Sequence, residues 1–136
     1  MLTEEEFLKE SLNANLYYLR TLRDFCINIE LSFYEDNKYK EQAMLLAKRS
    51  QDLGREIITF TNGKVPLKGV EYQIFYTEYT LRTERLTEKL FNIDLATDIT
   101  EKQLELNPTD TFEINEGVIN TLTAINERAS SIASDF

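Results

Sequence analysis

Apolar side chains recur along most of this sequence at alternating steps of four and three residues. Such a step averages 3.5 residues, which places the apolar side chains on one stripe of an α-helix. Stripes of this period are typical of helices that pack nearly antiparallel, at about 20°. The four stripes are Leu8, Leu12, Asn15, Leu19, Leu22, Cys26, Ile29 and Phe33; Tyr39, Ala43, Leu46, Ser50, Leu53, Ile57 and Phe60; Tyr72, Phe75, Tyr79, Thr83, Leu86, Leu90 and Ile93; and Thr111, Asn115, Val118, Leu122, Ile125, Ala129, Ile132 and Phe136. The sequence therefore predicts an all-α fold, a four-helix up-down bundle.

Local signals mark where the helices begin and end. Thr3 and Glu6 have the spacing of a capping box, in which each side chain bonds to the backbone of the other residue. Asn62 followed by Gly63 is a good helix stop. The first predicted helix ends before the turn at Asp36-Asn37, and the second runs from about 38 to 62. A loop at 63–70 leads to a third helix from about 71 to 92, which ends at Asn92. A connector at 93–109, with one helical turn after Thr100, precedes a fourth helix that starts after Pro108 and Asp110. We expect one domain, residues 1–136, with its long connector between the third and fourth helices.

Composition narrows the choice of partners and compartment. The net charge of −9 repels phosphate backbones and anionic lipid, so we expect neither nucleic acid nor a membrane as a partner. The opening residues are acidic and do not follow the order of a signal peptide, which favours a cytoplasmic protein. Cys26 is the single cysteine, so no disulfide can form within the chain. It lies on an apolar stripe, and we expect it to be a small buried hydrophobic residue.

The chain contains no histidine, which excludes the catalytic and metal sites that need this residue. A Cys–His nucleophile, a zinc site of Cys and His, and the Glu-x-x-His metal motif of many helical bundles are all excluded. A carboxylate site for a divalent metal stays open, and it would need several acids that face inward. On a helical wheel Glu30 lies about 50° from the centre of its stripe. The wheel places Glu84 on the outside.

Other polar residues occupy or border the predicted interior. They are Asn15, Ser50, Arg82, Thr83 and Asn115. In an up-down bundle Glu30 and Asn115 come at the same end, so a hydrogen bond between them is feasible. Leaving Glu30 charged and unpaired in a core would be costly. We therefore expect Glu30 to be a structural carboxylate with a partner. The alternatives are a metal ligand and a side chain that is simply exposed.

Two stretches of the sequence resemble a known family. Leu16-Tyr17-Tyr18-Leu19-Arg20, with Glu30 and Phe33 further on, is similar to a helix of the domain of unknown function 2935, a family of uncharacterised bacterial proteins. Residues 79–100 resemble the family's Thr-Leu-x-x-Glu helix and the loop after it. The resemblance implies a helical bundle, often in two tandem copies per chain, and a metal site built from His and Glu. Here the family's Glu-His pair reads Asp24-Phe25, and the acids retained are Glu30 and Glu84.

Two functions remain open, with an enzyme as a third. The first is a non-enzymatic bundle that acts by association with itself or with another protein and needs no cofactor. Eight apolar residues off the stripes favour it: Leu16, Ile27, Leu31, Leu45, Ile58, Ile74, Leu81 and Ile119. The second is a metal- or small-ligand-binding bundle related to ferritin-like proteins, which would hold a divalent metal through Glu30 and Glu84. An enzyme would have to work with Glu, Tyr and Lys side chains alone.

Overall fold

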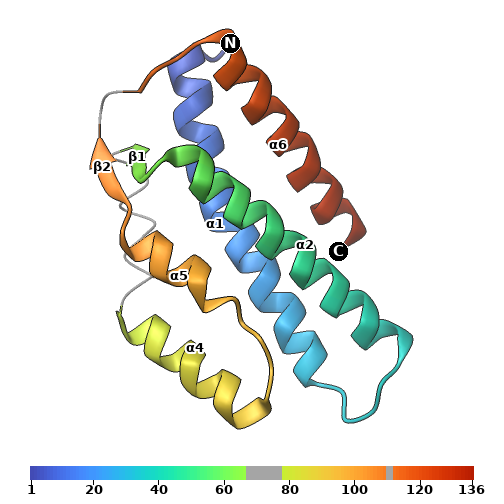
Figure 1. Ribbon diagram of the computed structural model, residues 1–136. Coiled ribbons are helices and arrows are strands. Elements are labelled where there is room, and N and C mark those ends of the chain that lie inside the picture. The colour runs from blue at the N-terminus through green and yellow to red at the C-terminus, as the bar shows by residue number, and fades with distance from the viewer. Residues whose placement is uncertain (67–77, 110–111) are drawn as a thin grey trace.

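The protein is an all-helical chain, described here from a computed structural model (Figure 1). The structure describes residues 1–66, 78–109 and 112–136. In chain order its elements are α1 (Glu4–Leu31), α2 (Lys38–Thr61), β1 (Lys64–Pro66), α4 (Glu78–Phe91), α5 (Thr97–Leu104), β2 (Asn107–Thr109) and α6 (Glu116–Asp135). The predicted all-α class is confirmed. The count of four helices is not, because the described residues alone form five.

The first two helices form a long antiparallel hairpin, and their predicted ends are confirmed. The Thr3 hydroxyl accepts a hydrogen bond from the Glu6 N–H, and the Glu6 carboxylate accepts one from the Thr3 N–H. Asn37 caps α2 by accepting from the N–H groups of Tyr39 and Lys40. At the other end Asn62 takes a left-handed backbone conformation with φ of 51°. Both helices are therefore closed by side-chain signals that the sequence displays.

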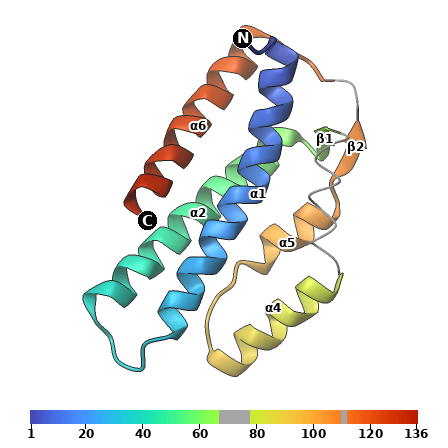
Figure 2. The same ribbon diagram turned by 180° about the vertical axis from the view of Figure 1, so that it is seen from behind.

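Helix α6 runs parallel to α1, whereas an up-down bundle would make the two antiparallel. Figures 1 and 2 show both helices starting at the same end of the molecule. The Asn15 amide on α1 donates to Asn126 of α6 over 2.6 Å, and Asn126 donates to Ser11. The reason for the difference lies in the connector. Its helix α5 has eight residues and runs back along α4, so the chain starts α6 from the end of the molecule where α1 begins.

A short pair of strands joins the end of α2 to the segment before α6. Strands β1 and β2 are parallel, with Val65 opposite Pro108. Val65 is fully buried, and the Asn107 N–H donates to the Gly63 carbonyl over 2.8 Å. The sequence predicts only loop and connector here, because three-residue strands are too short to show an alternating apolar pattern.

The core lies between the α1–α2 hairpin and α6. Of the predicted α1 stripe, Leu8, Leu12, Leu19 and Cys26 are buried, but Ile29 is 39% exposed. Helix α1 is also covered on its other side by α4 and α5, as both views show. Residues off the predicted stripe are buried there as a result. They are Arg20, Arg23 and Ile27.

Helix α4 is rotated relative to the prediction. Its expected interior residues Tyr79, Leu86 and Leu90 are 67%, 56% and 69% exposed, while Glu84 is 6% exposed. Tyr72 and Phe75 of the same stripe lie outside the described residues. Apolar periodicity fails here because the side chain that α4 directs inward is a carboxylate with charged partners on α1. None of the helices in the described part of the chain is both long and apolar enough to cross a membrane.

Candidate functional site

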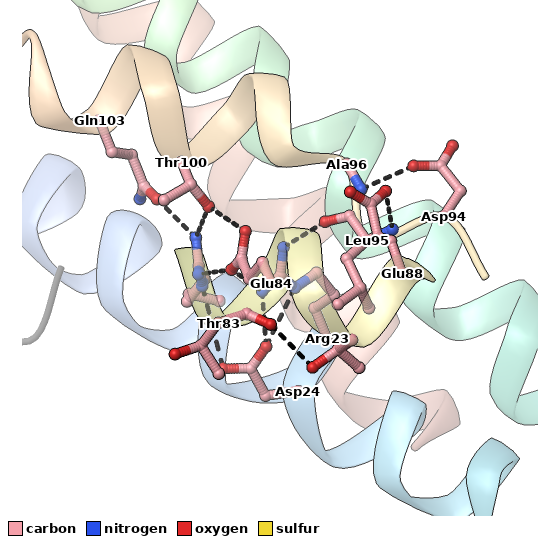
Figure 3. A network of polar contacts seen from close by, with 12 residues as sticks. Arg23, Asp24, Thr83, Glu84, Glu88, Asp94, Leu95, Ala96, Thr100 and Gln103 are labelled. Atoms are coloured by element: carbon pink, nitrogen blue, oxygen red, sulfur yellow. Dashed lines mark hydrogen bonds and ion pairs between the residues drawn. The ribbon is translucent and has the colours of Figure 1, made fainter. Parts of the chain in front are cut away.

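The most polar part of the interior is a cluster of five buried side chains from three helices (Figure 3). Arg20 and Arg23 lie three residues apart on α1, so both side chains extend from the same side of that helix. Glu84 comes from the middle of α4. Thr100 and Gln103 come from α5, again three residues apart. Each of the five is at most 7% exposed.

Glu84 is the centre of this cluster. Its Oε1 accepts hydrogen bonds from Nη2 of Arg20 and, over 3.0 Å, from Nη2 of Arg23. Its Oε2 accepts from the Thr100 hydroxyl over 2.6 Å. Nη1 of Arg20 donates to the Thr100 hydroxyl oxygen over 2.8 Å and to Oε1 of Gln103 over 3.0 Å. One carboxylate therefore links α4 to both α1 and α5.

Arg23 has further partners at the edge of the cluster. It donates to the Leu95 carbonyl over 2.9 Å and, from Nη2, to the Asp24 carboxylate over 2.7 Å. Burial lowers the pKa of Arg23, but the charges of Asp24 and Glu84 and the hydrogen bonds to them outweigh it, so the net shift is upward. Asp24 is half exposed. Two buried cations thus face one buried and one half-exposed anion, which balances the charge.

The turn between α4 and α5 is fixed by two more carboxylates. Glu88 accepts from the Leu95 N–H over 3.1 Å, and Asp94 accepts from the Ala96 N–H over 2.8 Å (Figure 3). These bonds hold Ala96 in a left-handed conformation with φ of 51° at the start of α5. The two helices are consequently held as a pair, with Glu84 and Thr100 facing each other.

The arrangement offers little to a metal ion or a reaction. Both oxygens of Glu84 already accept hydrogen bonds from Arg20, Arg23 and Thr100. Within the described ranges, no three His, Cys, Asp or Glu side chains gather as a metal site would require. The predicted ligands Glu30 and Glu84 lie in different surroundings. Glu84 is bound by Arg20 and Arg23, whereas Glu30 lies near the end of α1, where burial raises its pKa and the charge of Lys40 offsets part of the rise. The geometry favours a structural role for the cluster, which attaches α4 and α5 to α1.

The other predicted interior residues divide into two groups. Asn15 and Ser50 are buried, as expected; Asn15 donates to the Ser11 carbonyl and to Asn126, and Ser50 to the Leu46 carbonyl. The interior placement of the rest is wrong: Arg82, Thr83 and Asn115 are exposed.

The proposed hydrogen bond between Glu30 and Asn115 is also wrong. Asn115 caps α6 by accepting from the Val118 N–H over 2.9 Å, and this end of α6 lies beside the start of α1. Glu30 is at the opposite end of α1. The contact depended on α6 running antiparallel to α1, and that direction is reversed.

Glu30 itself is half-buried, and its carboxylate is disfavoured there. Burial raises the pKa of Glu30, and the charge of Lys40 offsets part of that shift. A carboxyl group whose pKa is raised on folding stabilises the fold below its unfolded pKa. That stabilisation is lost as the pH rises through the folded value.

We expect Glu30→Gln to be at least as thermally stable as the parent at pH 7, because glutamine carries no charge to desolvate. The difference should vanish near pH 4, where the parent carboxyl group is largely protonated. Thermal melts at the two pH values measure this. A lower melting temperature for Glu30→Gln at pH 7 would instead show that the charged carboxylate has a stabilising partner, as the sequence analysis expects.

Sequence reasoning missed Arg20, Arg23, Thr100 and Gln103, and misplaced Glu84. A helical wheel assigns charged residues off the apolar stripe to solvent, so it cannot find an ion pair that is buried between helices. A usable signal was nevertheless present. Arg20 is the last residue of the Leu-Tyr-Tyr-Leu-Arg motif and Glu84 the last of the Thr-Leu-x-x-Glu motif that resemble the domain of unknown function 2935, and the structure brings the two together.

A second feature is an apolar groove at the free end of the hairpin. It has a volume of about 400 Å³ and begins where α6 ends, at Asp135 and Phe136. Its other lining residues come from α1 and α2: Cys26, Ile29, Tyr39, Gln42, Ala43, Leu45, Leu46 and Arg49. Burial raises the pKa of the Cys26 thiol, which keeps it protonated and unreactive. The groove therefore offers apolar surface and no reactive group.

The chain matches no protein-family model, and neither curated proteins nor solved structures give a significant match. The resemblance to the domain of unknown function 2935 stays a prediction. What the protein does has to be inferred from its cluster and its groove.

Proposed function

We propose that this is a non-enzymatic helical protein that acts by association, with itself or with a protein partner, through the apolar groove at the free end of the α1–α2 hairpin. The observation that supports this most directly is that large, exposed apolar side chains of α1 and α2 gather at this one groove.

The exposed side chains around the groove are large and apolar. Tyr39 and Leu45 are each 58% exposed, and Phe25 is 55% exposed beside the ring of Phe136. Scattered single residues of this kind are normal on a protein surface, but a contiguous patch marks an interaction site. These residues are contiguous because they line or adjoin one groove.

The groove supports association better than the eight apolar residues that lie off the predicted stripes. Among the residues off the stripes, Leu16, Ile27 and Ile58 are buried in the core, so they cannot contact a partner. Ile74 lies outside the described residues, and Leu81 and Ile119 are half-buried. Leu31 and Leu45 are exposed, and Leu45 lines the groove.

We further propose that the chain is a single copy of the domain of unknown function 2935, from a bacterium and in the cytoplasm. The meeting of Arg20 and Glu84 supports the first point, since it gives both resembling stretches a common physical role. The single buried cysteine agrees with a reducing compartment. The acidic surface agrees with a protein partner rather than nucleic acid or lipid.

Photo-crosslinking tests the association. We expect p-benzoylphenylalanine in place of Leu45, at the groove, to give a covalent adduct in the cells that make this protein. The same probe in place of Glu127, which is exposed on α6, is the matched control and should give none. If position 45 gives no adduct, or gives no more than position 127, the proposed function fails.

A further inference from the structure

A different groove lies where α1 and α2 meet the turn between α4 and α5. It has a volume of about 560 Å³, which is within the range of about 300–1,000 Å³ that is typical of small-molecule sites. Much of its lining is apolar, from Ile27, Met44, Leu45, Ala47 and Ile93. Because Glu30 also lines it, we name it the Glu30 groove.

Glu30 gives this groove a carboxylate that lacks a hydrogen-bond donor. The side chain is half-buried, and no donor within residues 1–66, 78–109 and 112–136 bonds to its oxygens. Burial raises the pKa of Glu30, and the charge of Lys40 offsets only part of that rise. The Lys40 ammonium is itself paired with Asp36, over 3.3 Å. A desolvated acid in a groove is typical of a functional site.

The other charged side chains of the Glu30 groove are paired or exposed. Arg55 donates to both oxygens of Asp98, over 2.9 and 3.0 Å, and to Asp52 over 3.2 Å. Asp94 accepts from a backbone N–H, and Lys48 is exposed. Three carboxylates and two cations line the groove, which leaves one negative charge in excess: Glu30, Asp52, Asp94, Lys48 and Arg55.

These features favour an organic cation over other ligands. An anion would be repelled by the excess carboxylate, and a neutral apolar molecule would bury Glu30 further without giving it a partner. A metal ion needs several acids together, and the described ranges contain no group of three. An ammonium on an apolar chain would give Glu30 a charge-assisted hydrogen bond and would cover the apolar lining.

We propose that the Glu30 groove binds a small organic cation, a primary ammonium that carries an apolar chain. The ammonium donates to the Glu30 carboxylate, and the chain packs against Ile27, Met44 and Ala47. The site is independent of the proposed function, since it lies in another groove and needs no protein partner. Without ligand the protein bears the cost of a desolvated carboxylate, which the ammonium removes. Glu30→Gln should therefore stabilise the empty protein and weaken binding at the same time.

Titration with n-hexylammonium chloride at pH 7, followed by amide chemical shifts in NMR, tests the site. We expect saturable shifts within residues 27–30, 44–52 and 92–94. Glu30→Gln should bind about tenfold more weakly or less, the loss expected when a hydrogen bond to a charged group is removed. Glu127→Gln is the matched control: it removes the same charge from an exposed position on α6, and it should bind as the parent does.

Two measurements on the parent chain need no variant. The neutral n-hexanol has the same apolar chain without the charge, so it should bind more weakly than n-hexylammonium. An ammonium beside the carboxylate favours its charged form, so n-hexylammonium should lower the pKa of Glu30, which NMR of the side-chain carboxyl carbon measures.

Four results would overturn the inference. They are no saturable binding by the parent, equal binding of n-hexanol, binding by Glu30→Gln as tight as that of the parent, and a Glu30 pKa that n-hexylammonium leaves unchanged. Equal weakening in Glu127→Gln would also overturn it, because it would indicate attraction to the net charge of −9 rather than to this groove. A far-UV circular dichroism spectrum like that of the parent shows that each variant is folded.

Discussion

Glu84→Gln should lower the free energy of unfolding by about 3 kcal/mol, and Glu84→Ala by up to about 5 kcal/mol. The large effect follows from burial. Glu84 is the one carboxylate of the cluster that is fully buried, and it accepts hydrogen bonds from Arg20, Arg23 and Thr100. Without its charge, two guanidinium groups at 7% exposure or less retain only half-exposed Asp24 as an anionic partner. Urea unfolding followed by circular dichroism measures the loss.

Glu101→Gln is the matched control, because it is the same substitution in an exposed ion pair, which joins α5 to α4. Glu101 pairs with Arg85, but both side chains are about half exposed. Exposed pairs contribute less than about 1 kcal/mol, so the control should be nearly neutral. Equal effects for Glu84→Gln and Glu101→Gln would show that the buried cluster is worth no more than a surface pair. Hydrogen exchange should also become faster across 78–104 in Glu84→Gln, since these helices lose their attachment to α1.

The parts of the fold that sequence predicted are those that depend on local chemistry. Thr3 with Glu6 and Asn62 with Gly63 act within one helical turn, and the first two helices begin and end where these signals place them. Leu8, Leu12 and Leu19 are buried because the stripe they form meets α2 and α6. For such residues the pattern and the packing agree.

The parts that sequence missed depend on contacts between distant segments. The apolar stripe of α4 predicts Leu86 and Leu90 as core, yet they are exposed, because Arg20 and Arg23 bind the opposite side of that helix through Glu84. The apolar periodicity within α4 does not predict this orientation of the helix, because the arginines that determine it lie about 60 residues earlier in the chain. Likewise the eight residues of α5 reverse the chain and set the direction of α6. Glu30 and Asn115, placed together by the sequence analysis, are separated by that reversal.

Leu122→Ala should lower the free energy of unfolding by about 3 kcal/mol, within the range of about 2–5 kcal/mol for removal of a buried leucine side chain. Leu122 is fully buried in the core between α6 and the hairpin, so its removal leaves a cavity that the three helices cannot easily close. Leu90→Ala is the matched control on α4 and should change stability by no more than about 0.5 kcal/mol, because Leu90 is 69% exposed. Both measurements use urea unfolding under the same conditions. The two variants show which side of α4 faces the interior. In an up-down bundle Leu90 belongs to the core, whereas in this structure Glu84 takes the inward position. Equal losses of stability for Leu90→Ala and Leu122→Ala would support the up-down bundle and contradict the buried position of Glu84.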